Sequence, residues 1–417
     1  MQLILVANCA LRAVPRVLQI TFSFIGQDWY IPSWSTVRLW LLRIGLAQLR
    51  IPLEPADDWI WIVDCSVQIG NQKVLVILGV RASSIIWGQS LSHKEVNLVA
   101  LEVLNQAKKE DIHRCLEESC RSAMVPTAIV SDHGADLLAG IKLLQESHSE
   151  IRNLYDAKHK AACLLKANLE KDRLWTQFQT QLGQCKFKTQ QTVFAYASAP
   201  SQRSKAKYMN LQKVVRWAKR ILWHLDKQSK ARPISPAQSE RDQKFRELFG
   251  WVEEYRPSID RWSQWLEAIE STLDLVRREG LSKASKGRLE ERLAQYNKED
   301  PIISSLIEFI NSQSKLIRQH EKLPLSTEVL ESLFSKLKNA ERTQEKSGFT
   351  SMVLSLGAML GPKTIQSISE ALHSTPTKAV YEWAKEKLGK TVQAARMAFY
   401  RQSNPRNKTG QNETAIA

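Results

Sequence analysis

Two aspartates stand in runs that would otherwise bury only apolar side chains. Asp64 interrupts WIWIVDCSV, where Ile60, Ile62 and Asp64 share one face because side chains alternate along a strand. Asp132 directly follows the short apolar run 127–130 in PTAIVSDHGAD, and Ser131 separates them. An unpaired buried carboxylate costs several kcal/mol, so each aspartate needs a partner or a coordinated cation.

Each aspartate also has a plainer explanation. Asp132 precedes an expected helix, and Asp is a preferred N-cap residue. No helix follows Asp64, but a buried salt bridge to an arginine would satisfy it. The chemical alternative is a metal site, because carboxylate oxygens are the ligands that Mg²⁺ prefers. Two such ions about 3.5–4 Å apart can activate an attacking oxygen and stabilise a leaving one in phosphoryl transfer.

A third acidic ligand is predicted in the helix PLSTEVLESLFSKLKN. Its buried face is expected to hold Leu330, Leu333, Phe334 and Leu337. At about 100° per residue, Glu331 lies on the flank of this face and Glu328 lies nearer to solvent. Lys338 follows Glu331 by two helical turns, so the pair predicts a metal ligand and a phosphate contact. The alternative is that Glu331 is an ordinary exposed residue, and Glu328 an acid favoured in the first turn.

Composition limits the classes of function. The chain has 417 residues, enough for two or three domains, and a formal net charge of +16. Such a basic surplus indicates a polyanionic partner, most often nucleic acid. No apolar run approaches the roughly 18 residues of a membrane span, so no membrane partner is expected. The six cysteines form no Cys-x-x-Cys pair, which argues against a zinc finger and suits a reducing cytoplasm.

Much of the basic charge lies in one segment. Residues 160–232 contain 16 Lys and Arg against 3 Asp and Glu. A solvated helix face normally mixes both signs, so this segment predicts a phosphate-contacting surface. Its central basic residues are Arg203, Lys205, Lys207, Lys213, Arg216, Lys219 and Arg220. The tryptophans of this region, including Trp217 and Trp223, are expected to be buried in a helical core.

The first 55 residues are predicted to be helical. In PSWSTVRLWLLRIGL, apolar residues recur at helical spacing and Gly45 can end the helix. With the preceding VPRVLQITFSFIG, this fits a helix-turn-helix whose Arg38 and Arg43 contact phosphates. A packing helix without a DNA role is the alternative. The segment is short for such a domain, and an incomplete, truncated one is a further interpretation.

A change to strand patterns begins at Asp58. The runs WIWIVDCSV and KVLVILGVRAS predict a hairpin, with SIIWGQSL as a third strand. A long helix is expected at about 93–124, a strand at 127–130, a helix at 134–147 and a strand at 151–155. Early antiparallel strands followed by α/β crossovers predict a mixed five-stranded sheet covered by helices.

These patterns divide the chain as follows. The expected parts are an N-terminal helical segment (1–55), the first part of an α/β core (56–160), a basic all-α insertion (161–322), the rest of the core with C-terminal helices (323–402), and a disordered polar tail (403–417).

The acidic residues and their order resemble the catalytic signature of DDE transposases. The resemblance rests on Asp64 in the first strand, Asp132 in SDHGAD, and Glu331 with Lys338 in E-x6-K. The long interval before Glu331 is similar to the subgroup with an all-helical insertion, which includes hAT and Mutator-like elements and several bacterial insertion-sequence families. That subgroup often has Cys-x-x-His after the fifth strand, and the segment from Asp156 to His159 has this spacing with Asp in place of Cys. A helix N-cap is the alternative for Asp156.

The resemblance implies an RNase H-like core and a metal-dependent reaction on DNA. Water would attack a phosphodiester at the element's end, and the freed 3′-hydroxyl would attack target DNA. Asp64, Asp132 and Glu331 would bind two Mg²⁺ ions, for which Mn²⁺ would substitute, with Asp156 and His159 in support. The insertion would hold the end DNA and the N-terminal helices would read the terminal inverted repeats. A homodimer or higher assembly, in the cytoplasm at the nucleoid, is implied by analogy.

Two other functions fit the same residues. One is an RNase H-like nuclease that cuts without joining. The other is a non-catalytic DNA-binding protein derived from a transposase.

Overall fold

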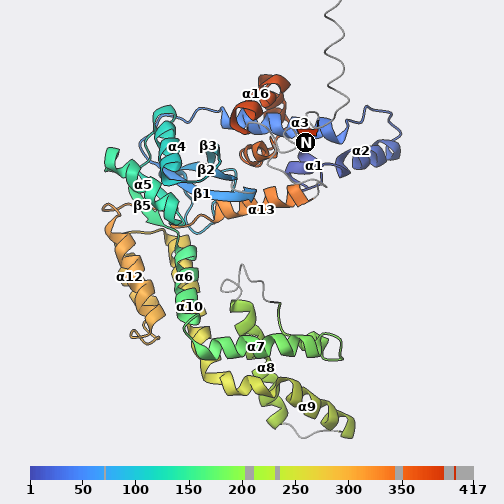
Figure 1. Ribbon diagram of the computed structural model, residues 1–417, viewed down its shortest axis with the longest axis vertical. Coiled ribbons are helices and arrows are strands. Elements are labelled where there is room, and N and C mark those ends of the chain that lie inside the picture. Colours follow the sequence, from blue (N-terminus) through green and yellow to red (C-terminus); the bar gives the residue numbers. More distant parts are fainter. Residues whose placement is uncertain (70–71, 202–210, 231–234, 343–350, 389–398, 401–417) are drawn as a thin grey trace, which may run out of the picture. The chain divides into compact units, whose positions relative to one another are not determined.

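The computed structural model describes residues 1–69, 72–201, 211–230, 235–342, 351–388 and 399–400. The chain divides into two compact units. Unit 1 comprises Met1–Leu154 and Ser326–Ala417, and unit 2 comprises Tyr155–Leu325 (Figure 1). The expected polar tail, 403–417, lies outside the described residues.

Within the described residues, unit 1 is built on a mixed five-stranded sheet, as the sequence predicts. Its strands are β1 (Trp59–Ile69), β2 (Gln72–Arg81), β3 (Asn97–Leu104), β4 (Ala128–Ser131) and β5 (Arg152–Tyr155). They lie in the order β3-β2-β1-β4-β5. β1 pairs antiparallel with β2, and β2 with β3, whereas β4 runs parallel to β1. The sheet therefore changes from antiparallel to parallel pairing at β1.

One face of this sheet is covered by α4 (Lys109–Ser122) and α5 (Ala135–Ser147). Trp61 and Val63 of β1 point to this face and are fully buried with Ile129 of β4. Because side chains alternate along a strand, the neighbouring residues Ile62 and Asp64 point to the opposite face.

The third strand is not where the sequence predicts it. Residues 97–104, expected to open a long helix, form β3 instead, and the helix α4 begins only at Lys109. β3 pairs with β2, and its Val99 and Val103 are β-branched residues that favour strands. The expected strand SIIWGQSL is turn and loop, with Gly88 at a φ of 92°. Pairing with β2 overrides the local helical spacing of apolar residues.

The N-terminal residues form α1 (Gln2–Leu5), α2 (Ala13–Phe24) and α3 (Trp34–Leu49). The sequence suggested that Gly45 ends this helix. That prediction is wrong, because Gly45 lies inside α3. There α3 crosses α14 (Ser355–Ala358), and a Cβ on Gly45 would lie 1.8 Å from the Leu354 carbonyl oxygen. A Cβ on Gly357 would in turn lie 2.5 Å from the Gly45 oxygen. Glycine is required here by close backbone approach rather than by a turn.

The C-terminal helices of unit 1 are α13 (Glu328–Arg342), α15 (Ile365–Ser374) and α16 (Thr377–Leu388). Helices α14, α15 and α16 all contact α3. Arg43 of α3 donates hydrogen bonds to the carbonyl oxygens of Leu372 and Thr375, the latter at 2.7 Å. These bonds satisfy carbonyls at the C-terminal end of α15. α3 therefore packs against the C-terminal helices, and the DNA contacts predicted for it stay predictions.

Unit 2 is helical. Its α-helices are α6 (Ala157–Leu169), α7 (Arg173–Thr189), α8 (Leu211–Lys230), α9 (Pro236–Phe249), α10 (Arg256–Glu279), α11 (Ser285–Arg292) and α12 (Pro301–Lys315). An aromatic cluster in its core contains Trp175, Phe178, Tyr255 and Trp262, with ring centroids 5.0–6.3 Å apart.

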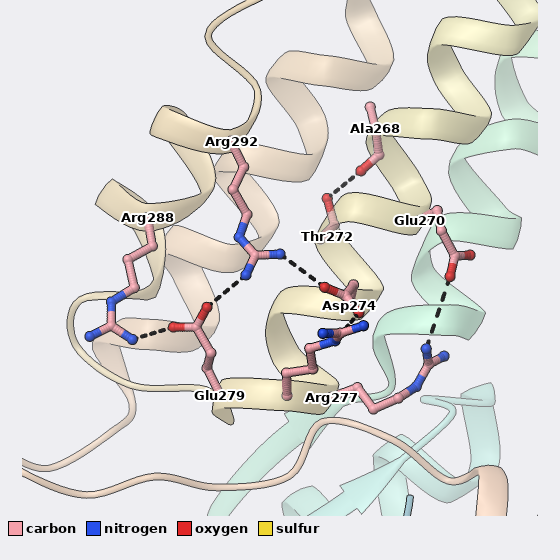
Figure 2. A network of polar contacts seen from close by, with 9 residues as sticks. Ala268, Glu270, Thr272, Asp274, Arg277, Glu279, Arg288 and Arg292 are labelled. Atoms are coloured by element: carbon pink, nitrogen blue, oxygen red, sulfur yellow. Dashed lines mark hydrogen bonds and ion pairs between the residues drawn. The ribbon is translucent and has the colours of Figure 1, made fainter. Parts of the chain in front are cut away.

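A network of ion pairs joins α11 to the end of α10 (Figure 2). Arg292 donates to Asp274 at 3.2 Å and to Glu279 at 2.7 Å, and Arg288 also binds Glu279. Two arginines on one glutamate hold α11 in a fixed position along α10.

Candidate functional site

Asp64 and Asp132 lie side by side in unit 1. Val63 of β1 is the parallel partner of Ser131 in β4. The residues that follow this pair are Asp64 after β1 Val63 and Asp132 after β4 Ser131, so they are neighbours as well. Neighbouring strands lie about 4.7–4.9 Å apart. Both aspartates are half-buried, and both follow residues whose side chains face α4 and α5, so they occupy the opposite face. Residues that are far apart in the sequence thus form one carboxylate pair.

The electrostatics of Cys65 reflect this pair. The pKa of its thiol is raised to about 12, first by burial and then by the charge of Asp64, with Asp132 also contributing. Lys73 acts in the opposite direction. Because the charges of both carboxylates act on this one thiol, Asp64 and Asp132 both lie near Cys65.

Asp132 also shapes the turn between β4 and α5. Its Oδ1 accepts a hydrogen bond from the Gly134 main-chain N–H at 2.9 Å. The N-cap of α5 is Gly134, so Asp132 is not the N-cap that the plainer explanation proposed. Among the described residues, the second oxygen of Asp132 has no hydrogen-bond partner.

His133 is a neighbour that the sequence interpretation did not single out. Its φ is 53°, in the left-handed region that non-glycine residues seldom adopt. Its Nε2 lies 2.9 Å from Oδ1 of Asn153 in β5. Strained residues cluster at functional sites, and the hydrogen bond to Asn153 helps to hold this one in place. The sequence feature that could have pointed to this strained residue is the position of His133, a non-glycine residue between Asp132 and Gly134, where the chain turns from strand to helix.

The predicted third acid lies on α13, which contacts β1. The expected apolar face is buried, at Leu330, Leu333, Phe334 and Leu337. The relative exposure of the two glutamates is the reverse of that predicted, since Glu331 is exposed and Glu328 half-buried. Glu328 is the first residue of the helix, its N–H donates to Ser326 Oγ at 3.2 Å, and the adjoining residues Thr327 and Val329 are buried. At a helix end, the chain entering the helix affects exposure as much as helical angle does.

Asp64 and Asp132 fit a hard divalent cation, because they offer adjacent carboxylates with an oxygen of Asp132 still available. Within the described part of the chain, however, no three His, Cys, Asp or Glu side chains are grouped so that they could hold a metal ion. Neither Glu331 nor Glu328 completes the pair in this structure. The third ligand and the metal stay predictions.

Asp156 and His159 belong to unit 2. Asp156 is fully buried, and its Oδ1 accepts from the His159 N–H at 2.6 Å, which makes it the N-cap of α6. The alternative interpretation of Asp156, a helix N-cap, therefore agrees with its geometry in the structure.

A basic surface runs along α8 in unit 2. Its exposed residues recur at alternating intervals of three and four, which places them on one side of the helix. We call this the α8 stripe: Lys213, Arg216, Arg220, Trp223, Lys227 and Lys230. Among the described residues, Lys213, Arg216 and Arg220 have no carboxylate partner, whereas Lys219 beside the stripe lies 3.7 Å from Glu267. The predicted contacts Arg203, Lys205 and Lys207 lie outside the described residues.

The two tryptophans of α8 differ in exposure. Trp217 is buried as predicted, at 4% exposure, and its Nε1 donates to the Ala197 carbonyl oxygen at 2.8 Å. The same prediction is wrong for Trp223, which is 51% exposed. Trp223 follows Arg216 by two turns and therefore shares the α8 stripe. The Lys227 ammonium lies 4.2 Å from its ring centroid, in a cation–π contact.

The remaining predicted DNA contacts are in unit 1. Arg38 of α3 is half-buried, and burial lowers the pKa of its guanidinium. Lys338 is exposed on α13.

No family model matches the sequence, and no curated protein matches it. One solved structure, titled "Drosophila P element transposase strand transfer complex", is similar to this chain with a TM-score of 0.42 and 13% sequence identity. The similarity covers 85% of this chain and 90% of that one. Among the described residues, no helix has the length and apolar character needed to cross a membrane.

Proposed function

We propose that this chain is a DDE-type DNA transposase with an RNase H-like core, which cuts DNA at the ends of a mobile element and joins them to target DNA. The main observation in support of this proposal is the pair of carboxylates, Asp64 and Asp132. Asp64 and Asp132 follow paired residues of the adjacent parallel strands β1 and β4, and both lie on the face of the sheet opposite α4 and α5. Phosphoryl transfer needs carboxylates fixed in this way.

In this proposal Asp64 and Asp132 hold Mg²⁺, with Glu331 as the third ligand. Metal ions held there would supply activation of the attacking oxygen and stabilisation of the leaving one. The Asp132 turn, with its bond from the Gly134 N–H, fixes one carboxylate, and the bond between His133 and Asn153 supports that turn. Lys338 contacts a DNA phosphate.

The α8 stripe is proposed to bind the DNA backbone. Its basic residues have the spacing of one helix side, and the exposed ring of Trp223 lies among them. Cations that lack carboxylate partners are free to exchange counterions for phosphates. The proposal further includes a homodimer or higher assembly at the nucleoid, because two DNA ends must be joined.

A second candidate is a DNA-binding protein that has the scaffold without catalysis. The favouring observation is that no acidic side chain among the described residues joins Asp64 and Asp132 in a metal-binding group. A nuclease that cuts without joining is distinguished from both by its products.

The test uses the purified chain, Mg²⁺ and a plasmid carrying the DNA on both sides of the coding sequence, where the proposal expects terminal inverted repeats. We expect wild type to nick or cut at the repeats and to produce joined products. Asp64→Asn and Asp132→Asn should lose both activities and keep DNA binding. Asp136→Asn, an exposed acid in the first turn of α5, is the matched control and should retain them. Cleavage without joining would indicate the nuclease. Binding without cleavage in wild type would indicate the non-catalytic protein.

A further inference from the structure

A second group of basic side chains lies in unit 1, whereas the α8 stripe belongs to unit 2. It gathers His93 and Lys94 of the loop before β3, Lys336 of α13, and Lys363 between α14 and α15. Lys336 Nζ lies 2.9 Å from His93 Nδ1, and the Gly361 N–H donates to the His93 carbonyl oxygen at 3.1 Å. Three segments distant in sequence are therefore tied together at His93.

The hydrogen bonds define the state of His93. A lysine ammonium can only donate, so Nδ1 of His93 must accept and the imidazole is neutral. His93 also hydrogen-bonds the main chain at Val329 in the first turn of α13. Its burial, and then the charge of Lys336, lower the pKa of His93. The imidazole of His93 is held by these contacts, and its hydrogen bond orients the Lys336 ammonium.

The lysines retain unused donors. Lys336 gives one hydrogen to His93, and Lys363 gives one to the Leu5 carbonyl oxygen at 3.2 Å. Each ammonium has three hydrogens, so both keep donors for another group, and the exposed Lys94 adds more.

No salt bridge between described residues compensates the charge of this cluster. In the part of the chain that the structure describes, no carboxylate is paired with Lys94, Lys336 or Lys363. By contrast, Lys387 of α16 binds Glu102 at 3.0 Å, so unit 1 does pair lysines elsewhere. Lys363 has its pKa lowered, first by burial and then by the charges of Lys336 and Lys94. Like charges held near one another repel, and a bound anion would remove that cost.

We propose that Lys94, Lys336 and Lys363, brought together at His93, form an anion site that takes a phosphate group. Several ammonium donors from different segments suit the several oxygens of a tetrahedral anion. The phosphate belongs either to a DNA backbone or to a free phosphate ion, since the chemistry of recognition is the same. The DNA source rests on the proposed function, whereas the site itself does not.

The first test measures the melting temperature of the full chain against sodium phosphate, with sodium chloride at matched ionic strength as reference. Wild type should melt at higher temperature as phosphate is raised, because ligand binding stabilises the folded state. Lys336→Gln and Lys363→Gln should lose most of this rise. Lys94→Gln tests the same site at an exposed side chain, where the substitution removes a charge without disturbing packing. Lys378→Gln, whose lysine pairs with Glu382 on α16, is the control and should keep the rise.

The second test separates the two sources through binding of a labelled DNA duplex over a range of salt. A backbone phosphate at the site predicts weaker binding in the lysine variants and a salt slope smaller by about 0.9 for each phosphate no longer neutralised. A free phosphate ion predicts unchanged DNA binding with the melting effect still lost. The proposal is overturned if wild type shows no phosphate-dependent rise, or if the lysine variants keep it. Asp64→Asn should keep the rise, so failure of this site is distinguishable from failure of the proposed catalysis.

Discussion

At the scale of single residues, strand alternation and parallel register explain why Asp64 and Asp132 meet. The sequence predicts both positions, because a carboxylate in an apolar strand is unusual wherever the strand pairs. It does not predict His133, whose left-handed φ of 53° depends on the turn geometry and on Asn153. It also ranks Glu331 and Glu328 incorrectly by exposure, because helical angle says nothing of the chain entering α13.

The Asp132 turn makes a first prediction. Asparagine can accept the Gly134 N–H through its amide oxygen, so Asp132→Asn should keep the turn and relieve repulsion with Asp64. Alanine cannot accept that bond, so Asp132→Ala should unfold more readily than Asp132→Asn, by about 1 kcal/mol. Urea unfolding of both variants measures the difference. Equal stabilities would mean that the bond contributes nothing to the fold.

At the scale of elements, pairing and packing decide where local patterns mislead. The segment 97–104 has helical spacing of apolar residues, yet it forms β3. It pairs there with the edge of β2 that faces away from β1, and this pairing outweighs the local pattern. The position of Gly45 resembles a helix stop, yet α3 continues because α14 lies against its backbone. Both outcomes depend on distant segments, which no local window contains. The helices of 135–147 and 328–342, in contrast, follow their local periodicity.

The crossing of α3 and α14 makes a second prediction. Gly45→Ala places a Cβ 1.8 Å from the Leu354 carbonyl oxygen, so the helices must move apart. We expect a loss of about 1–3 kcal/mol in the free energy of unfolding. Gly183→Ala in α7 is the matched control, since no atom lies within 4 Å of its Cβ, and it should stabilise slightly. A neutral Gly45→Ala would contradict the close approach.

The two tryptophans of α8 make a third prediction. Trp217→Ala should cost about 3–5 kcal/mol, because the ring is buried and its indole donates to Ala197. Trp223→Ala should change stability far less and weaken nucleic-acid binding instead, since its ring is half exposed on the basic stripe. Thermal unfolding and DNA anisotropy of the same two variants separate these roles. If both variants lost stability equally, Trp223 would be a core residue.

At the scale of the whole molecule, much of the surplus of +16 falls in the segment 160–232. The sequence alone predicts a polyanionic partner and a basic helical region, because charge counts need no structure. It cannot tell which cations are already paired. The structure makes that distinction, since Lys219 lies near Glu267 whereas Lys213, Arg216 and Arg220 have no carboxylate partner among the described residues.

This distinction makes a fourth prediction. Replacing Lys213, Arg216 and Arg220 by Gln should weaken DNA binding and reduce its salt slope by about 0.9 for each phosphate that the variant no longer neutralises. The control replaces Lys244 and Lys286, lysines of unit 2 that pair with Glu240 and Glu290. If the control lowered affinity equally, binding would depend on net charge and not on the α8 stripe.

The central claim is that Asp64 and Asp132 jointly hold a divalent cation. Electron paramagnetic resonance of Mn²⁺ added to the purified chain tests this directly, because it needs no knowledge of the DNA substrate. We expect saturable binding by wild type, abolished in both Asp64→Asn and Asp132→Asn and kept in Asp136→Asn. Glu331→Gln and Glu328→Gln, measured together, identify the third ligand by which of them weakens binding. Equal Mn²⁺ binding by wild type and the two aspartate variants would contradict the claim.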